Sequence, residues 1–139
     1  MRIAQGRVEV ATKGPGFYDV TAQAAAWVAE QGVGTGLLTL FIRHTSASLL
    51  IQENAAPEVR TDLTNFLARL APEDPSRWRH DDEGADDMPA HARAAMLPVQ
   101  LSVPVAGGRL LLGTWQGIYV VEHRRRPHRR EVVFHLTGT

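Results

Sequence analysis

The sequence predicts a single-domain α+β protein with a largely antiparallel sheet. Segments that alternate apolar and polar residues gather in the last third of the chain, and the turns between them are too short for parallel crossovers. Two longer segments with helical spacing of apolar residues lie in the first half. A length of 139 residues, 44% hydrophobic and 22% charged, suits one soluble core, so we expect residues 1–139 to form one domain.

In the first half of the chain we expect a strand, a helix and a second strand. Residues 7–11 alternate, and the turn sequence Lys13-Gly14-Pro15-Gly16 ends this strand. Asp19 is expected to be the N-cap of a helix that ends at Gly32. The apolar run 37–42 predicts a central strand buried on both faces.

The next predicted element is a helix from Pro57 to Leu70, and Pro72 follows it. Residues 72–87 have little periodicity and predict a long loop. A short helix is expected over 88–96 with Asp87 as its cap. Strands are then predicted at 99–105, 109–112, 115–123 and 131–136, with a Gly107-Gly108 hairpin turn after the first of them.

The composition excludes several classes of protein. The chain has no cysteine, so disulfides, cysteine nucleophiles and Cys-type zinc sites are ruled out, and a transition-metal site would use His and carboxylate ligands. Fifteen Lys or Arg balance fifteen Asp or Glu, which argues against nucleic acid as a partner. The N-terminus lacks a signal core and no apolar run could span a membrane, so we expect a cytoplasmic protein that binds no membrane.

The charges are segregated along the chain. Five acids lie within residues 81–87, and five arginines lie within residues 124–130. Two solvated loops of opposite sign would explain this pattern. The alternative is that both segments lie around one anionic or metal-bearing site.

Four segments carry side chains suited to chemistry. Residues 43–48 follow the predicted central strand, whose rigid end would position polar groups for a ligand. A Ser/Thr-rich turn without a ligand is the alternative interpretation of this segment. Residues 52–54 and 86–91 fit either ligand contacts or helix caps. Residues 112–117 place Trp and Gln between glycines, as in a ligand-binding wall or a core hairpin. Strand alternation puts Glu122 and His123 on opposite faces.

These segments resemble the YjbQ-like family, and the resemblance covers nearly the whole chain. The motifs that carry it are specific in combination and in order: H-T-S-A-S-L at 44–49, Q-E-N-A-A-P-E-V-R-T-D-L at 52–63, H-D-D-E-G-A-D-D-M-P-A-H at 80–91, G-T-W-Q-G-I-Y at 113–119 and E-H-R at 122–124.

The resemblance implies a small α/β sandwich that assembles as a homotrimer, with sites near the subunit contacts. It also implies a divalent metal, Zn²⁺ or Mg²⁺, with ligands among His44, His91, His80 and Asp87. By position, the implied catalytic residues are His44, Thr45, Ser46, Asn54, His91, Gln116 and Glu122. The implied substrate-binding residues are Thr114, Trp115 and Arg124.

The activity associated with this family is thiamine-phosphate synthesis, possible as a secondary reaction. A hydroxymethylpyrimidine diphosphate is joined to a thiazole phosphate, and diphosphate is released. The expected partner is therefore a small phosphorylated substrate. A non-catalytic module that binds a metal or a phosphate ligand is the alternative, and RNA binding through the arginines at 124–130 is disfavoured by the neutral net charge.

Overall fold

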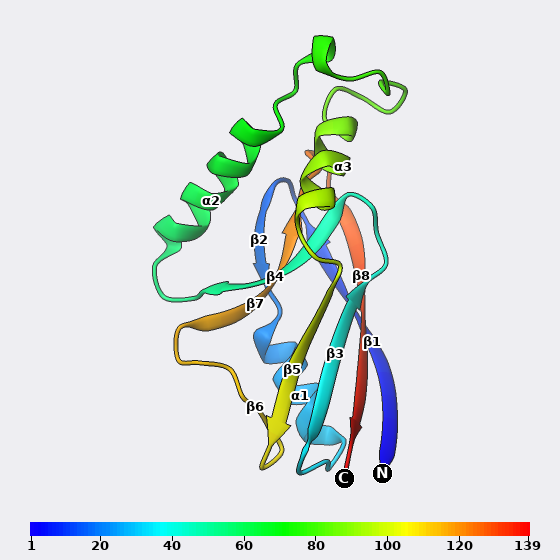
Figure 1. Ribbon diagram of the computed structural model, residues 1–139, viewed down its shortest axis with the longest axis vertical. Coiled ribbons are helices and arrows are strands. Elements are labelled where there is room, and N and C mark those ends of the chain that lie inside the picture. Colours follow the sequence, from blue (N-terminus) through cyan, green and yellow to red (C-terminus); the bar gives the residue numbers. More distant parts are fainter.

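Two antiparallel sheets form the framework of the computed structural model, which describes residues 1–139 (Figure 1). Every strand pairing is antiparallel. The larger sheet has the order β1-β8-β3-β5-β6 and the smaller one β2-β7-β4. The strands are β1 (Arg2–Thr12), β2 (Gly16–Asp19), β3 (Gly36–Ile42), β4 (Ala47–Glu53), β5 (Gln100–Ala106), β6 (Arg109–Leu110), β7 (Gln116–Glu122) and β8 (His128–Gly138). The predicted α+β class with largely antiparallel strands is confirmed.

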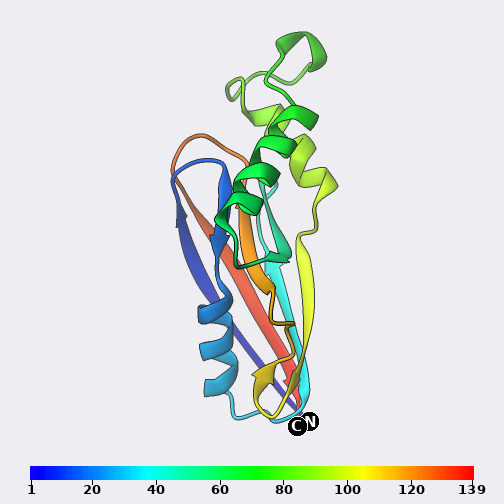
Figure 2. The same cartoon turned by 90° about the vertical axis from the view of Figure 1, so that its left-hand side faces the viewer.

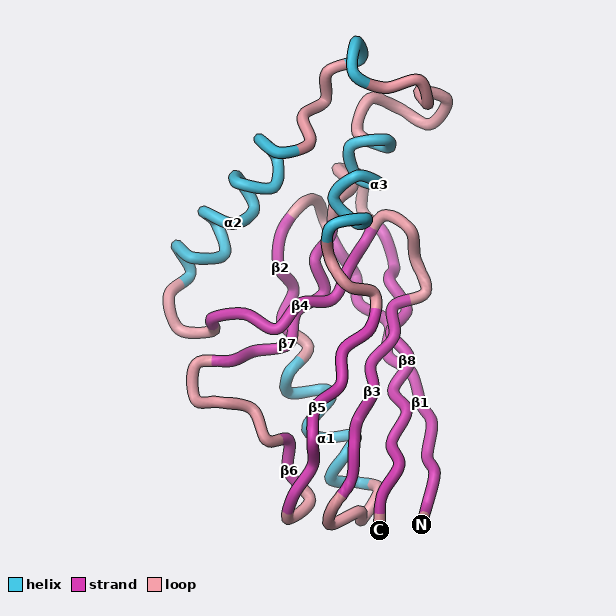
Figure 3. Tube along the Cα trace, viewed as in Figure 1, coloured by secondary structure: helices cyan, strands magenta, loops and turns pink.

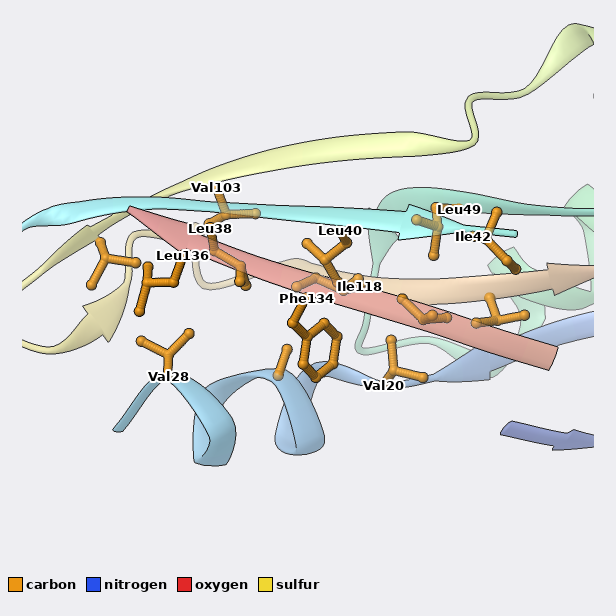
Figure 4. Close-up of a cluster of buried hydrophobic side chains, with 14 of the residues drawn as sticks. Val20, Val28, Leu38, Leu40, Ile42, Leu49, Val103, Ile118, Phe134 and Leu136 are labelled. Atoms are coloured by element: carbon orange, nitrogen blue, oxygen red, sulfur yellow. The ribbon is translucent and has the colours of Figure 1, made fainter. Parts of the chain in front are cut away.

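Helix α1 (Thr21–Glu30) closes the core from one side, facing strands β3 and β8 (Figure 4). Its Ala24 and Val28 are buried in one apolar cluster with Leu40 and Phe134. The N-cap is Val20 rather than the predicted Asp19, whose carboxylate still accepts a hydrogen bond from the Thr21 backbone N–H at 2.8 Å. The helix ends before Gly32, whose φ of +68° is a left-handed conformation that glycine adopts without steric cost.

Strand β3 lies in the middle of the larger sheet, as its apolar sequence predicts, but its burial differs from the prediction. Leu38, Leu40 and Ile42 are buried, whereas Leu37 and Phe41 are 42% and 46% exposed. The prediction of burial on both faces is therefore wrong for this single chain. Only one face of the larger sheet packs on α1 and the smaller sheet, so the apolar residues of the other face remain uncovered.

Strands β2 and β4 were not recognisable from the sequence. β2 has only four residues, and β4 ends in Gln52 and Glu53, which resemble a polar linker before the next helix. Both strands gain their backbone partners from β7, which lies between them. This pairing brings the segment after His44 beside the end of β7.

Helices α2 (Pro57–Leu70) and α3 (Asp87–Met96) extend beyond one end of the sheets (Figure 2). The loop between them holds only the short 3-10 helix η1 (Pro75–Arg77), so the prediction of a long loop holds. Asp87 is the first residue of α3 and its side chain turns to other partners, which corrects its predicted role as a cap.

The chain termini lie together at the other end, beside the β5–β6 turn (Figure 3). Gly107 and Gly108 have φ of +57° and +73° in that turn, which fits the tight hairpin turns that favour glycine. β6 and β7 are shorter than predicted, and β1 and β8 are longer. None of the helices combines the length and hydropathy needed to cross a bilayer.

Candidate functional site

Two histidines and one carboxylate converge where α3 begins. His80 Nε2 lies 2.8 Å from Asp87 Oδ2, and His91 Nε2 lies 3.2 Å from the same oxygen. The three candidate ligand atoms lie within 4.8 Å of one another. We call His80, Asp87 and His91 the triad.

Helix geometry brings two members of the triad together. Asp87 and His91 are four residues apart on α3, so their side chains lie on one face. His80 comes from the loop between η1 and α3. The triad therefore needs both the helix and the returning loop.

Arg124 fixes the orientation of the triad carboxylate. Its Nη1 donates to Asp87 Oδ1 at 2.6 Å, its Nε donates to Asp86 Oδ2 at 3.1 Å, and its Nη2 donates to the Glu83 carbonyl at 3.0 Å. The Arg125 backbone N–H donates to Asp86 as well. The acidic and basic segments thus meet at one place, and Oδ2 of Asp87 is left facing the histidines.

Electrostatics keep the Asp87 carboxylate ionised. Burial alone would raise the pKa of Asp87, but the hydrogen bond from His80 and the charges of His91 and Arg124 outweigh burial and lower the pKa. A deprotonated carboxylate is the form that binds a cation.

The His91 ring is oriented from outside the triad. Its Nδ1 lies 2.9 Å from the Thr45 carbonyl oxygen, which can only accept, so Nδ1 carries a proton. In the neutral ring the Nε2 lone pair then points at the Asp87 carboxylate, an arrangement that a proton or a metal ion must stabilise. A histidine held by a backbone carbonyl at one nitrogen is the usual arrangement of a metal-binding imidazole.

The triad fits a transition metal better than Mg²⁺. Imidazole nitrogens suit Zn²⁺, whereas Mg²⁺ prefers oxygen ligands. Bonds of about 2.0 Å in a tetrahedral zinc site separate ligand atoms by about 3.3 Å. The N–O separations of 2.8 and 3.2 Å are close to that value. Three protein ligands leave a coordination position for a substrate or water.

His44 lies outside the triad. Its Nε2 accepts a hydrogen bond from the Glu131 backbone N–H at 2.8 Å, so the lone pair of that nitrogen is occupied. Burial, aided by the charge of Arg130, lowers the pKa of His44. The neighbouring Thr45 is connected to the triad through its carbonyl alone.

A buried ion pair supports the segment that carries His44. Arg130 donates through Nε to Glu122 at 2.8 Å and through Nη2 to the Ser46 hydroxyl at 3.0 Å. Burial would raise the pKa of Glu122, but the hydrogen bonds from Arg130, Thr12 and the Arg124 backbone lower it. Glu122 and Ser46 are thus part of a buried network in which the Glu122 carboxylate is fully engaged.

The remaining predicted residues gather at the other end of β7. Asn54 Nδ2 donates to the carbonyls of Thr114 and Gln116 at 3.2 Å each, and Trp115 is 65% exposed. The register pairs Ala47 with Glu122 but Glu53 with Gln116, six residues farther along the strand. At about 3.4 Å per residue, this group lies roughly 20 Å from Glu122 in the same chain.

Two residues that matter here were named from the sequence only as members of larger segments, with no role of their own. Asp86 shares Arg124 with the triad, and Arg130 anchors Glu122 and Ser46. The signal for Asp86 was its adjacency to Asp87. Nothing in the sequence distinguishes Arg130 from the other arginines near it, because only its burial separates it from them.

The fold and the triad define a small α+β protein with a two-histidine, one-carboxylate cluster that could hold a metal ion. Residues 6–139 match the family model described as "UPF0047 protein YjbQ-like", and the chain belongs to this family. The resemblance read from the motifs is confirmed.

Relatives and solved structures agree with this assignment. UPF0047 protein sll1880 of Synechocystis is 54% identical over 129 residues, which are 93% of this chain and 88% of that protein. The conserved hypothetical protein TT1486 of Thermus thermophilus has a crystal structure with a TM-score of 0.82 and 38% identity, covering 92% of this chain and 97% of that one. A YbjQ-like protein of unknown function from Sulfolobus solfataricus shares the fold, with a TM-score of 0.87 at 22% identity, covering 99% of this chain and 100% of that one.

Proposed function

We propose that the protein is a metal-dependent transferase of the thiamine-phosphate synthase kind, acting on small phosphorylated substrates. The observation that carries this proposal is the triad, whose three candidate ligand atoms converge. Its carboxylate is oriented by a hydrogen bond from Arg124, and the His91 imidazole by its hydrogen bond to the Thr45 carbonyl. Such pre-orientation is what a site needs to bind a cation without rearrangement.

In the proposed reaction the carbon–oxygen bond between the pyrimidine methylene and the diphosphate breaks, and the thiazole nitrogen takes the place of the leaving oxygen. A divalent cation held by the triad would supply charge stabilisation to the departing diphosphate. His80, Asp87 and His91 would hold this cation, and Arg124 fixes the orientation of the Asp87 carboxylate that would bind it.

Within the basic segment 124–130, this proposal assigns phosphate binding to Arg126. Arg124 uses Nε, Nη1 and Nη2 on Asp86, Asp87 and Glu83, and Arg125 pairs with Glu73. Arg126 has no ion pair and lines a polar pocket with Arg124 and His128, and its exposed guanidinium offsets the carboxylates of Asp82 and Glu83 on the same pocket. An exposed guanidinium at such a pocket suits a phosphate group.

We also propose that the active form is a homotrimer. The group around Asn54 and Gln116 lies roughly 20 Å from Glu122 within one chain, so only a neighbouring copy could bring it to the triad end. The uncovered sheet face with Leu37 and Phe41 offers apolar surface for such a contact. Sedimentation equilibrium tests the proposal, and a monomer at micromolar concentration would contradict it.

Turnover of the two thiamine precursors tests the enzymatic proposal. Zinc-loaded protein should form thiamine phosphate and diphosphate, and a chelator should abolish formation of both. His91→Ala should behave like the chelated protein. Gln23→Ala is the control, because Gln23 is exposed on α1, away from the triad and from the uncovered sheet face.

The alternative is a non-catalytic module that binds a metal or a phosphate ligand. The same triad supports this alternative, since the convergence of three ligands does not require a reaction. Stoichiometric zinc binding without turnover of the precursors would favour the module over the transferase.

A further inference from the structure

A cavity of about 380 Å³ lies on the other side of α3 from the triad. The volume falls within the usual range of small-molecule sites. Its apolar wall includes Phe17, Leu67 and Val121, and its polar residues include Arg93 and His123. On α3, Arg93 follows His91 by two residues, a rotation of roughly 200°, so it faces away from the triad.

Arg93 is a buried cation without an anionic partner. The residue is only 7% exposed, and its Nη1 and Nη2 donate to the carbonyls of Ala71 and His123 at 2.8 and 3.0 Å. The nearby acids are already engaged: Glu73 with Arg125, and Asp86 with Arg124. A buried charge without a counter-charge is costly, so its presence beside a cavity calls for an explanation.

His123 adds an unused polar atom at the same place. The residue is 1% exposed, and its Nε2 lies 2.9 Å from the Ser48 hydroxyl. Neither His123 Nδ1 nor Arg93 Nε has a hydrogen-bond partner in the protein. Every fully buried side-chain nitrogen or oxygen of the protein does have a partner, so these two nitrogens must retain some accessible surface. Both residues line the cavity, which is therefore where a ligand could contact these atoms.

The ring of His123 is neutral at physiological pH. Burial, followed by the charge of Arg93, lowers the pKa of His123 to about 4. The Glu122 carboxylate opposes this shift, but it is paired with Arg130. When the Ser48 hydroxyl donates to Nε2, Nδ1 carries the proton and becomes a donor.

We propose that this cavity is a binding site for a small organic monocarboxylate with an apolar body. The carboxylate would accept from Arg93 and from His123 Nδ1, and the apolar body would lie against Phe17, Leu67 and Val121. One unpaired guanidinium matches one negative charge. The carboxylates of Glu73 and Glu122 along the same wall disfavour a phosphate dianion.

Calorimetric titration with 4-phenylbutyrate and with its neutral analogue 4-phenylbutanamide tests the proposal at pH 7.5. We expect saturable binding of the acid, and at least about tenfold weaker binding of the amide, because a charge-assisted hydrogen bond is lost. Equal affinity for both compounds, or no saturable binding of the acid, would overturn the proposal.

Two variants locate the binding. Ala68→Phe places a ring in the cavity from α2 without removing any polar partner of Arg93, and it should weaken binding of the acid at least about tenfold. Ala25→Phe is the matched control on the exposed face of α1 and should bind the acid as the wild type does.

Arg93→Gln should also lose the preference for the acid over the amide. If this variant does not fold, the amide comparison and Ala68→Phe still decide the question. Wild-type binding by Ala68→Phe would show that the acid binds elsewhere and would overturn the assignment. The transferase proposal is unaffected by either result, since it depends on the triad.

Discussion

Arg124 donates to Oδ1 of Asp87 at 2.6 Å and leaves Oδ2 to the two histidines of the triad. The two residues are far apart in the sequence, and the contact joins the end of β7 to the start of α3. This arrangement makes Arg124 a positioning residue for a candidate metal ligand, and its contribution can be measured without removing any member of the triad.

Replacing Arg124 tests this positioning role. We expect Arg124→Gln to weaken zinc binding about 10–100-fold, the usual effect of removing a partner of a metal ligand. Competition with a chromophoric chelator measures the affinity. Arg129→Gln is the control because Arg129 is exposed on β8, and equal affinities for the two variants would contradict the role assigned to Arg124.

The composition of the ligand set gives a second prediction. His91→Ala and Asp87→Asn should each abolish stoichiometric zinc binding, whereas His44→Ala should retain it, because His44 Nε2 is occupied by the Glu131 backbone N–H. Zinc content after gel filtration measures the outcome. Loss of zinc from His44→Ala would place His44 among the ligands.

The buried pair of Glu122 and Arg130 gives a prediction on stability. Glu122→Gln leaves Arg130 buried without its counter-charge, so we expect a loss of about 3–5 kcal/mol in the free energy of unfolding. Urea denaturation measures it. Glu9→Gln removes the exposed partner of Arg129 and should change stability by less than about 1 kcal/mol. Similar losses in both variants would refute the importance of burial.

Because the pKa of His123 is lowered, we expect the free energy of unfolding to decrease in mild acid. Its pKa is about 4 in the folded protein against 6.5 for the free side chain, so between these pH values the unfolded chain binds more protons. The free energy of unfolding should therefore fall by about 2 kcal/mol from pH 7 to pH 5 through this residue. This contribution should be absent from His123→Gln. Urea denaturation of both proteins at the two pH values measures the difference, and parallel profiles would contradict the prediction.

Much of the fold could be predicted from local patterns. The helices at 57–70 and 88–96 and the hairpin at Gly107 and Gly108 depend on neighbours within a few residues, and the structure has them close to the expected bounds. β2 and β4 could not be predicted in this way, because their stability comes from pairing with β7, which lies far away in the sequence.

The candidate site shows the same division. His80, Asp87 and His91 were expected among the metal ligands because the family resemblance implies them, and they belong to one motif at 80–91. His44 was expected with them, but the direction of its side chain depends on the contacts of β8, which no local pattern encodes. Arg93 and His123 were not expected to meet, because the packing of α3 beside the end of β7 decides it.

The sequence by itself determined the α+β class, the family and the segments that hold the polar side chains. Periodicity and motifs report short-range geometry, which is the same in any fold. The tertiary structure alone decided which of those side chains face one another: Arg124 with Asp87, His44 with Glu131, and Arg93 with the cavity. Burial and charge pairing act between residues that are distant along the chain, so they take effect only once the strands and helices have packed.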